Sequence, residues 1–329
     1  MRPPPWLGRL VRVGVLVAAV LLLLLALRGQ GPQALDAARE VGAWAAAGSL
    51  TAVLVGLLAS LLVWRALLAD LGTRLSLRPA LQVFFLGQLG KYLPGSVFAI
   101  AAQMELGRAH GAPRSRVGTA GLVFMGVLVS AGLLTAVVAL PLTSPGTFDD
   151  YSWVLLALPV GLVALAPPVL TRLVGLLLRL LRRDPLDRPL SWRGTGAALG
   201  WACTMWVAYG VHLWLLVRSQ DSGLESGGAG ADLLLLSTGA YALAWTAGFL
   251  FVVAPAGFGV RELALVIALA PVLDRGQALA IAVLSRVLMT LGDLLWGAVG
   301  AFARANSGHS GAGVATVTEV KQPGKAVET

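Results

Sequence analysis

The sequence contains few charged residues for its length. Asp, Glu, Lys and Arg make up 12% of its 329 residues, while hydrophobic residues make up 57%. A typical soluble domain carries about 25% charged residues. A chain with so little charge is poorly suited to a water-facing surface, but it suits helices in lipid, whose backbone groups are all paired internally. Composition therefore predicts an all-α, polytopic membrane protein.

Cysteine and histidine are also scarce. Cys203 is the single cysteine, so disulfides and CxxC metal or redox motifs are excluded. His110, His212 and His309 are isolated in the sequence, without a second ligand at metal spacing. The sequence also contains neither a phosphate-binding Walker A loop nor a GxSxG nucleophile motif. We therefore expect no cofactor, no metal and no enzymatic activity.

The few charges are mainly positive, and the net charge is +9. Nucleic-acid binding would need a basic module outside the membrane, and the sequence offers none, so we expect no nucleic-acid partner. Cytoplasmic loops of membrane proteins collect Lys and Arg, which explains the excess more simply.

Apolar segments divide the chain into candidate membrane spans, each needing about 20 residues. Six segments qualify or nearly qualify: Val11–Leu27, Trp44–Val63, Val117–Leu140, Trp153–Ala166, Thr195–Val217 and Ala278–Phe302. Two further stretches are broken by Pro and Gly, and their halves are Pro79–Leu93 with Ser96–Arg108 and Leu233–Val253 with Val260–Leu273. We interpret the first segment as an uncleaved helix, because a poor cleavage site follows it.

The positive charges indicate the topology. If the amino terminus is inside and each broken stretch returns to the side it left, most Lys and Arg residues lie inside. The basic residues left outside are Arg28, Arg39, Arg218 and Arg275. This bias predicts a plasma-membrane protein with both termini in the cytoplasm and with Asp149 and Glu225 outside.

The order of segments predicts an internal repeat. Residues 11–142 and 153–302 each contain the same order of segments: two spans, a broken hairpin and a third span. Because each half crosses the membrane three times, the second copy would be inverted relative to the first. This is the pattern of transporters built from inverted repeats, whose sites lie where broken helices meet. Alternatively, Pro and Gly merely kink two ordinary helices. Residues 1–10 form a cytoplasmic amino terminus in this scheme, and 303–329 a disordered cytoplasmic tail.

Ionisable residues at membrane depth are energetically expensive and are therefore candidate functional residues. They are Lys91, Glu105, Arg108, Arg261, Glu262, Arg286 and Asp293. At the first break, Pro94 and Gly95 end one half-helix and begin another, whose free amides carry the positive end of its dipole. Lys91 and Tyr92 lie beside these amides, so this break could hold a phosphate. Alternatively, Lys91 snorkels to the interface and Tyr92 anchors it.

The second break offers a similar arrangement. Gly257 and Gly259 permit a tight turn, and Arg261 can grip a phosphate or carboxylate through its planar guanidinium. Glu262 complements the dipole of the helix that it opens. Alternatively, Arg261 and Glu262 form structural ion pairs with residues of the last helix. Asp293 and Arg286, seven positions apart on one face of that helix, are the candidate partners.

Three short motifs carry a family resemblance: GKYLPGSV (Gly90–Val97), ELGRAHG (Glu105–Gly111) and PAGFGVRE (Pro255–Glu262). Together they make the chain similar to the lysylphosphatidylglycerol synthase transmembrane region family, also described as flippase-like proteins. The resemblance covers roughly residues 10–302. Ala256 departs from the pattern, because glycine is common there in the family.

The resemblance implies a lipid-handling membrane domain. The soluble aminoacyl-transfer domain of the multidomain synthases has no counterpart, so we expect this chain not to make lysyl lipid itself. The leading hypothesis is an ATP-independent lipid translocase, in which Lys91 and Arg261 contact a lipid phosphate. Glu262 and Asp293 would contact a cationic group or form ion pairs. Candidate lipids are anionic or aminoacylated phospholipids and polyprenyl-linked lipids.

Two other functions remain open at this stage. The chain could be a non-catalytic membrane partner of a glycosyltransferase or of a lipid-modifying synthase. It could also be a polyprenyl-phosphate-dependent glycosyltransferase, which its short outer loops and missing acidic motifs disfavour.

Overall fold

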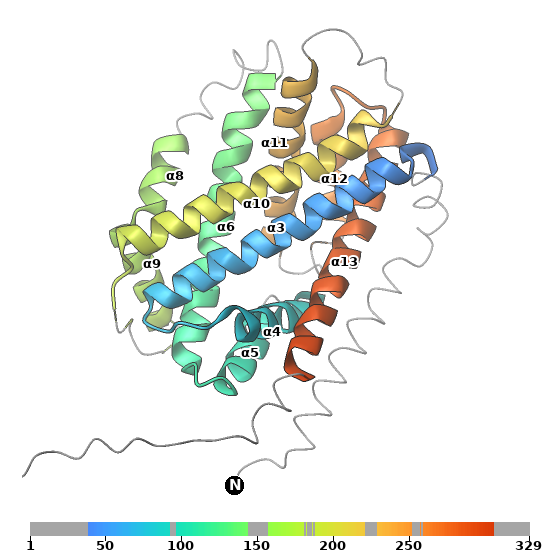
Figure 1. Ribbon diagram of the computed structural model, residues 1–329. Helices are drawn as coiled ribbons and strands as arrows, with labels where there is room; N and C mark the ends of the chain where they lie inside the picture. Colours follow the sequence, from blue (N-terminus) through green and yellow to red (C-terminus); the bar gives the residue numbers. More distant parts are fainter. Residues whose placement is uncertain are drawn as a thin grey trace, which may run out of the picture.

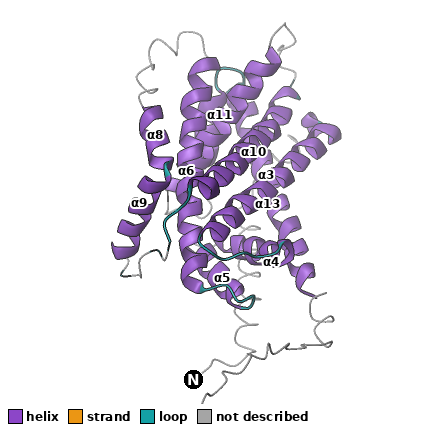
Figure 2. Ribbon diagram, turned by 60° about the vertical axis from the view of Figure 1, so that its left-hand side comes forward, coloured by secondary structure: helices purple, strands orange, loops and turns teal. Residues whose placement is uncertain are grey.

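The computed structural model describes residues 39–92, 97–143, 157–180, 182, 186, 188–220, 229–251, 257 and 259–305. Across this part of the chain the regular elements are helices, without a strand (Figures 1 and 2). Several predicted features lie outside the described residues, namely Val11–Leu27, Pro94, Gly95, Pro255, Asp149, Glu225 and the tail from residue 306.

The helices follow the predicted spans. In chain order they are α3 (Ala43–Asp70), α4 (Leu77–Gln88), the 3₁₀ turn η1 (Leu89–Tyr92), α5 (Val97–Arg108), α6 (Arg114–Thr143), α8 (Ala157–Leu165), α9 (Pro167–Leu180), α10 (Trp192–Arg218), α11 (Ala229–Leu250), α12 (Val260–Leu269) and α13 (Arg275–Ala305). Of these, α3, α6, α10, α11 and α13 are each long and apolar enough to cross a membrane. The prediction of an all-α, multi-pass membrane protein is confirmed.

The span predicted at Trp153–Ala166 has a different shape from the expected one. Its described part, α8, is followed directly by α9, and the two helices bend by 75° at Ala166. The cause is local, since Pro167 and Pro168 provide no backbone N–H and their rings disfavour a continuing helix. Together the two helices are long and apolar enough to form one broken span or a re-entrant loop, and they lie at the periphery of the bundle (Figures 1 and 2).

The two broken stretches form hairpins at opposite ends of the bundle, α4–η1–α5 at the lower end of Figure 1 and α11–α12 at the upper end. The helices α4 and α5 have 12 residues each, and α12 has 10. These three are too short to cross a membrane. The fourth, α11, has 22 residues and is long enough to span a membrane. It is about as long as the predicted stretch Leu233–Val253, but it begins and ends a few residues earlier.

Helix packing follows a pairwise pattern between the two halves of the chain. The long helices α3 and α10 pack against each other at the centre. In the first half of the chain, α4 contacts α13 and α5 contacts α6. Their counterparts in the second half behave in the same way, since α11 contacts α6 and α12 contacts α13. Exchanging each element with its counterpart in the other half reproduces the same contacts. An inverted repeat would produce this pattern, and the repeat itself stays a prediction.

Small residues bring the central helices together. A Cβ on Gly56 of α3 would lie 2.3 Å from Cε1 of Tyr209 on α10, so the ring occupies the space that a side chain would fill. Likewise, a Cβ on Gly210 of α10 would lie 1.9 Å from Oγ1 of Thr238 on α11. Glycine at such contacts permits the close packing on which association of membrane helices depends.

One end of the bundle gathers basic loops. Asp70, at the end of α3, accepts hydrogen bonds from the amide and hydroxyl of Ser191, which caps α10 (2.8 and 2.6 Å). Arg116 of α6 donates to the carbonyl of Gly72 (3.2 Å). The loops after α3, before α6 and before α10 therefore meet at one end, as the predicted cytoplasmic side requires.

Candidate functional site

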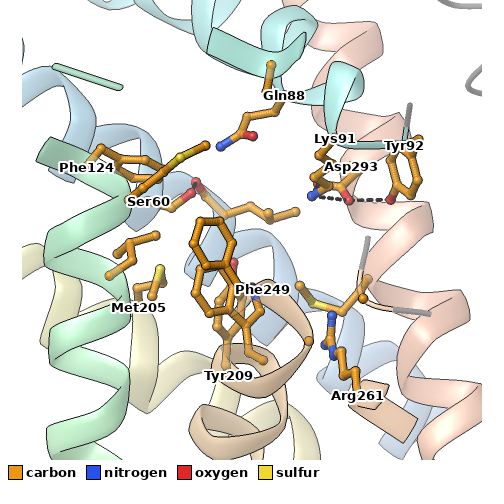
Figure 3. A pocket seen from close by; sticks show the side chains of 18 of the residues that line it. Ser60, Gln88, Lys91, Tyr92, Phe124, Met205, Tyr209, Phe249, Arg261 and Asp293 are labelled. Carbon is orange, nitrogen blue, oxygen red and sulfur yellow. Dashed lines mark hydrogen bonds and ion pairs between the residues drawn. The ribbon is translucent and has the colours of Figure 1, made fainter. Parts of the chain in front are cut away.

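A cavity of about 170 Å³ lies among the hairpins and the long helices (Figure 3). Its walls come from α3, α6, α10 and α13 and from both hairpins. Tyr92, at the end of η1, and Gly257, in the second break, line the same cavity. The two breaks, which the sequence separates by about half of the chain, therefore converge on one space.

The first hairpin is tied to α13 by an ion pair. Lys91 Nζ donates to Asp293 Oδ1 (2.8 Å), and the Tyr92 hydroxyl donates to Asp293 Oδ2 (2.6 Å). Asp293 is buried, whereas 33% of the Lys91 side chain is exposed. Figure 3 shows these three side chains together at one edge of the cavity. Lys91 is thus paired with an acid inside the protein, which the snorkelling alternative did not anticipate.

The second hairpin is tied to α13 by a pair of the opposite sense. Glu262, in the first turn of α12, accepts from Arg286 of α13, and both side chains are buried. The other carboxylate oxygen of Glu262 accepts from the amide of Gly259 (2.6 Å) and so caps α12. One of the structural ion pairs considered from the sequence is therefore present. Arg286 lines the cavity, while Glu262 lies behind it.

Arg261 is the cation of the cavity that lacks an acidic partner. Its guanidinium donates to the Tyr241 hydroxyl and lies 4.7 Å from the centre of that ring. No carboxylate pairs with it within the described part of the chain. The alternative pairing with Asp293 is not formed, and that carboxylate instead accepts hydrogen bonds from Lys91 and Tyr92.

Glycines position the second break against α11. Gly257 has a φ of 68°, which favours glycine. A Cβ on Gly257 would also lie 2.7 Å from Cα of Gly248, so the break lies directly on the α11 backbone. Gly259 has a φ of 84° but open space around it, and it does not line the cavity.

Two candidates lie away from the cavity. Glu105 and Arg108 pair with each other on α5 (3.1 Å), and Glu105 also accepts from Arg114 at the start of α6. All three side chains are largely exposed, at 45%, 65% and 54%. The hydrogen bond from Arg114 is the main cause that lowers the pKa of Glu105, against the opposing effect of burial. Neither candidate lines the cavity, because the charged face of α5 points away from it.

Neutral polar residues of the cavity were not among the candidates, which were ionisable side chains at membrane depth and residues of the two breaks. They include Gln88 of α4, Gln103 of α5, Ser60 of α3 and Thr290 of α13. An amide within an apolar helix is also expensive to bury. The same rule that selected Lys91 could therefore have found the two glutamines.

His212 belongs to a separate buried network. Its Nδ1 and Nε2 lie 2.6 Å from the hydroxyl of Ser49 and 2.8 Å from that of Ser285. The ring thus joins α3, α10 and α13, although His212 is isolated in the sequence. Sequence spacing cannot show such contacts between distant helices.

The charges around the cavity leave an excess of one positive charge. Lys91 and Arg286 are each paired with an acid, and Arg261 contributes the remaining charge. Arginine is suited to bind a phosphate or carboxylate with two parallel hydrogen bonds. The rest of the wall is largely apolar and aromatic, so the space suits an anionic group that is itself attached to an apolar molecule.

Comparison with known proteins agrees with the geometry. A family model described as "Lysylphosphatidylglycerol synthase TM region" matches residues 11–297, which includes both hairpins and the cavity between them. No curated protein matches the chain.

Proposed function

The chain belongs to the lysylphosphatidylglycerol synthase TM region family, and from this premise we propose that it is a lipid translocase. The lipid phosphate would enter the cavity between the hairpins and bind Arg261. The family links the chain to lipid handling, and the cavity supplies a site for a headgroup within a multi-pass membrane protein.

The observation that carries this proposal is the state of Arg261. A charge at membrane depth is expensive to keep and is normally paired or faces a polar space. Lys91 and Arg286 follow this rule with carboxylates, while Arg261 has a phenol and a cavity. A bound anion would supply the missing charge.

The hairpin arrangement suggests how the lipid would cross. Each hairpin enters from a different end of the bundle and is held to α13 by one ion pair. In our proposal, movement of one hairpin away from α13 opens the cavity toward one leaflet, and movement of the other opens it toward the opposite leaflet. The step would proceed without ATP, in line with the absence of a Walker A sequence.

Leaflet-resolved lipid transport in proteoliposomes tests this function. Arg261→Gln should abolish transport of an anionic phospholipid while leaving folded protein in the membrane, because it removes the charge that binds the phosphate. Arg261→Lys should retain part of the activity. Arg275→Gln is the matched control, since it makes the same change at an exposed position outside the cavity. Full transport by Arg261→Gln would contradict the proposal.

We also propose that the protein lies in the plasma membrane with both termini in the cytoplasm. The basic loops that meet around Asp70 and Gly72 support this orientation through the positive-inside rule. The test is labelling of intact cells with a membrane-impermeant thiol reagent, after Cys203→Ser removes the natural cysteine. Arg275→Cys should be labelled and Arg74→Cys should be protected, and the reverse result would invert the topology.

A further inference from the structure

Two uncharged amides project into the cavity without a partner. Gln88 of α4 and Gln103 of α5 both line it. Gln103 is only 3% exposed, yet neither side chain makes a hydrogen bond within the described residues. An amide has two donor hydrogens and an acceptor oxygen, and buried groups of this kind are normally satisfied. These amides therefore have hydrogen-bonding capacity to offer to a ligand.

The position of Gln103 depends on the residue that faces it. A Cβ on Gly87 of α4 would lie 2.3 Å from Cγ of Gln103 and 3.2 Å from its backbone nitrogen. Only glycine at position 87 leaves room for the Gln103 side chain between α4 and α5, the two helices of the first hairpin. The two halves of the first hairpin thus pack closely around Gln103, which lines the cavity.

Aromatic rings form another part of the same wall. Trp245 and Phe249 of α11 are stacked, with ring centres 5.2 Å apart and planes at 3° to each other. Both residues line the cavity together with Tyr209 of α10. The electron-rich face of such a ring attracts the partly positive C–H groups of a polyol or sugar, while amides bind its hydroxyls.

The acids of the cavity argue against a cationic headgroup. Asp293 is the one carboxylate among the described residues that line it, and both of its oxygens are already engaged by Lys91 and Tyr92. An ammonium group would therefore have to share this carboxylate with Tyr92 and with Lys91, whose cation already balances its charge. Hydroxyl groups need no such sharing, since the amides of Gln88 and Gln103 have no hydrogen-bond partner among the described residues.

We propose that the cavity binds a phosphodiester headgroup that carries hydroxyl groups, with the phosphate at Arg261 and the hydroxyls at Gln88 and Gln103. Figure 3 shows Gln88 and Arg261 on opposite sides of the cavity that both line, so a headgroup in this cavity would lie between them. This inference rests on the proposed function, because it names the class of lipid that the translocase would take.

The test compares two lipids with equal charge in proteoliposomes. Fluorescent phosphatidylglycerol and phosphatidylethanol are both monoanionic phosphodiesters, and only the first has headgroup hydroxyls. We expect the wild type to transport phosphatidylglycerol about fivefold faster or more, the ratio that a single hydrogen bond provides. The double variant Gln88→Met/Gln103→Met should lower the phosphatidylglycerol rate about fivefold, to near the phosphatidylethanol rate, and should change the phosphatidylethanol rate much less.

Gln82→Met is the matched control, since Gln82 is a buried glutamine of α4 that binds His110 and lies outside the cavity. It should keep the wild-type ratio, and size-exclusion profiles should confirm that all variants fold. Equal wild-type rates for the two lipids, or an equal loss of both rates in the double variant, would overturn the hydroxyl site while the translocase function stands. Transport of neither lipid by the wild type would instead count against the proposed function itself.

Discussion

The two hairpins are attached to the same helix through ion pairs of opposite sense. The first hairpin supplies the cation Lys91 and α13 supplies the acid Asp293, whereas the second supplies the acid Glu262 and α13 the cation Arg286. Asp293 and Arg286 are about two helical turns apart and therefore lie on one face of α13. A single helix face thus holds both hairpins.

The two pairs differ in their access to the cavity. Lys91 is 33% exposed, so a ligand or water can reach it, while the side chains of Glu262 and Arg286 are only 9% and 10% exposed. The second hairpin keeps Arg261 as an additional cation, and the first keeps two amides without partners. The comparison suggests that the Glu262–Arg286 pair serves structure and that the groups left unpaired serve binding.

The largest effect is expected where the more buried pair is broken. Glu262→Gln leaves Arg286 without its carboxylate and weakens the cap of α12, so it should destabilise the protein by about 3–5 kcal/mol. Thermal unfolding in detergent, followed by the loss of monodisperse protein, measures this change. The double variant Glu262→Gln/Arg286→Met should recover part of the stability, because it also removes the charge that is otherwise left buried.

A smaller loss of stability is expected for the first pair. Asp293→Asn leaves Lys91 and Tyr92 with a neutral partner, but Lys91 can turn to water in the cavity, so about 1–3 kcal/mol should be lost. The same unfolding assay measures it, and Lys91→Met/Asp293→Asn should be more stable than Asp293→Asn alone. A loss as large as that of Glu262→Gln would remove the distinction between the two hairpins.

The sequence was sufficient to predict most of the long helices and the two broken stretches, but not the bend between α8 and α9. Apolar runs of adequate length located α3, α6, α10 and α13, because lipid requires such runs in every span. Rare charges at membrane depth, and proline with glycine at the breaks, selected both hairpins and α13. The bounds of α11 were placed a few residues too late, since the helix already begins at Ala229, where the apolar signal is weak, and ends at Leu250.

Partner choice within the cavity could not be predicted. The sequence placed Asp293 and Arg286 on one face of a helix but gave no means to decide which hairpin each would bind. That choice depends on how the hairpins pack in three dimensions, which includes close contacts such as Gly248 against Gly257. Glu105 and Arg108 were selected for the same reason as Lys91, yet α5 turns them away from the cavity.

The smallest effect is expected for the ion pairs at the far end of the first hairpin. Glu105 binds Arg108 and Arg114 on an exposed surface, where such pairs contribute less than about 1 kcal/mol because water and salt screen them. Glu105→Gln should therefore leave lipid transport and thermal stability nearly unchanged.

The pKa of Glu105 is lowered, so the small stabilisation is present above the ordinary pKa of a glutamate and is lost as the pH falls through the lowered value. The stability difference between wild type and Glu105→Gln, measured from neutral to acidic pH, should shrink toward zero at the acidic end. A large transport defect in this variant would show that the hairpin acts through its outer end as well as through the cavity, and would break the division between binding groups and structural pairs.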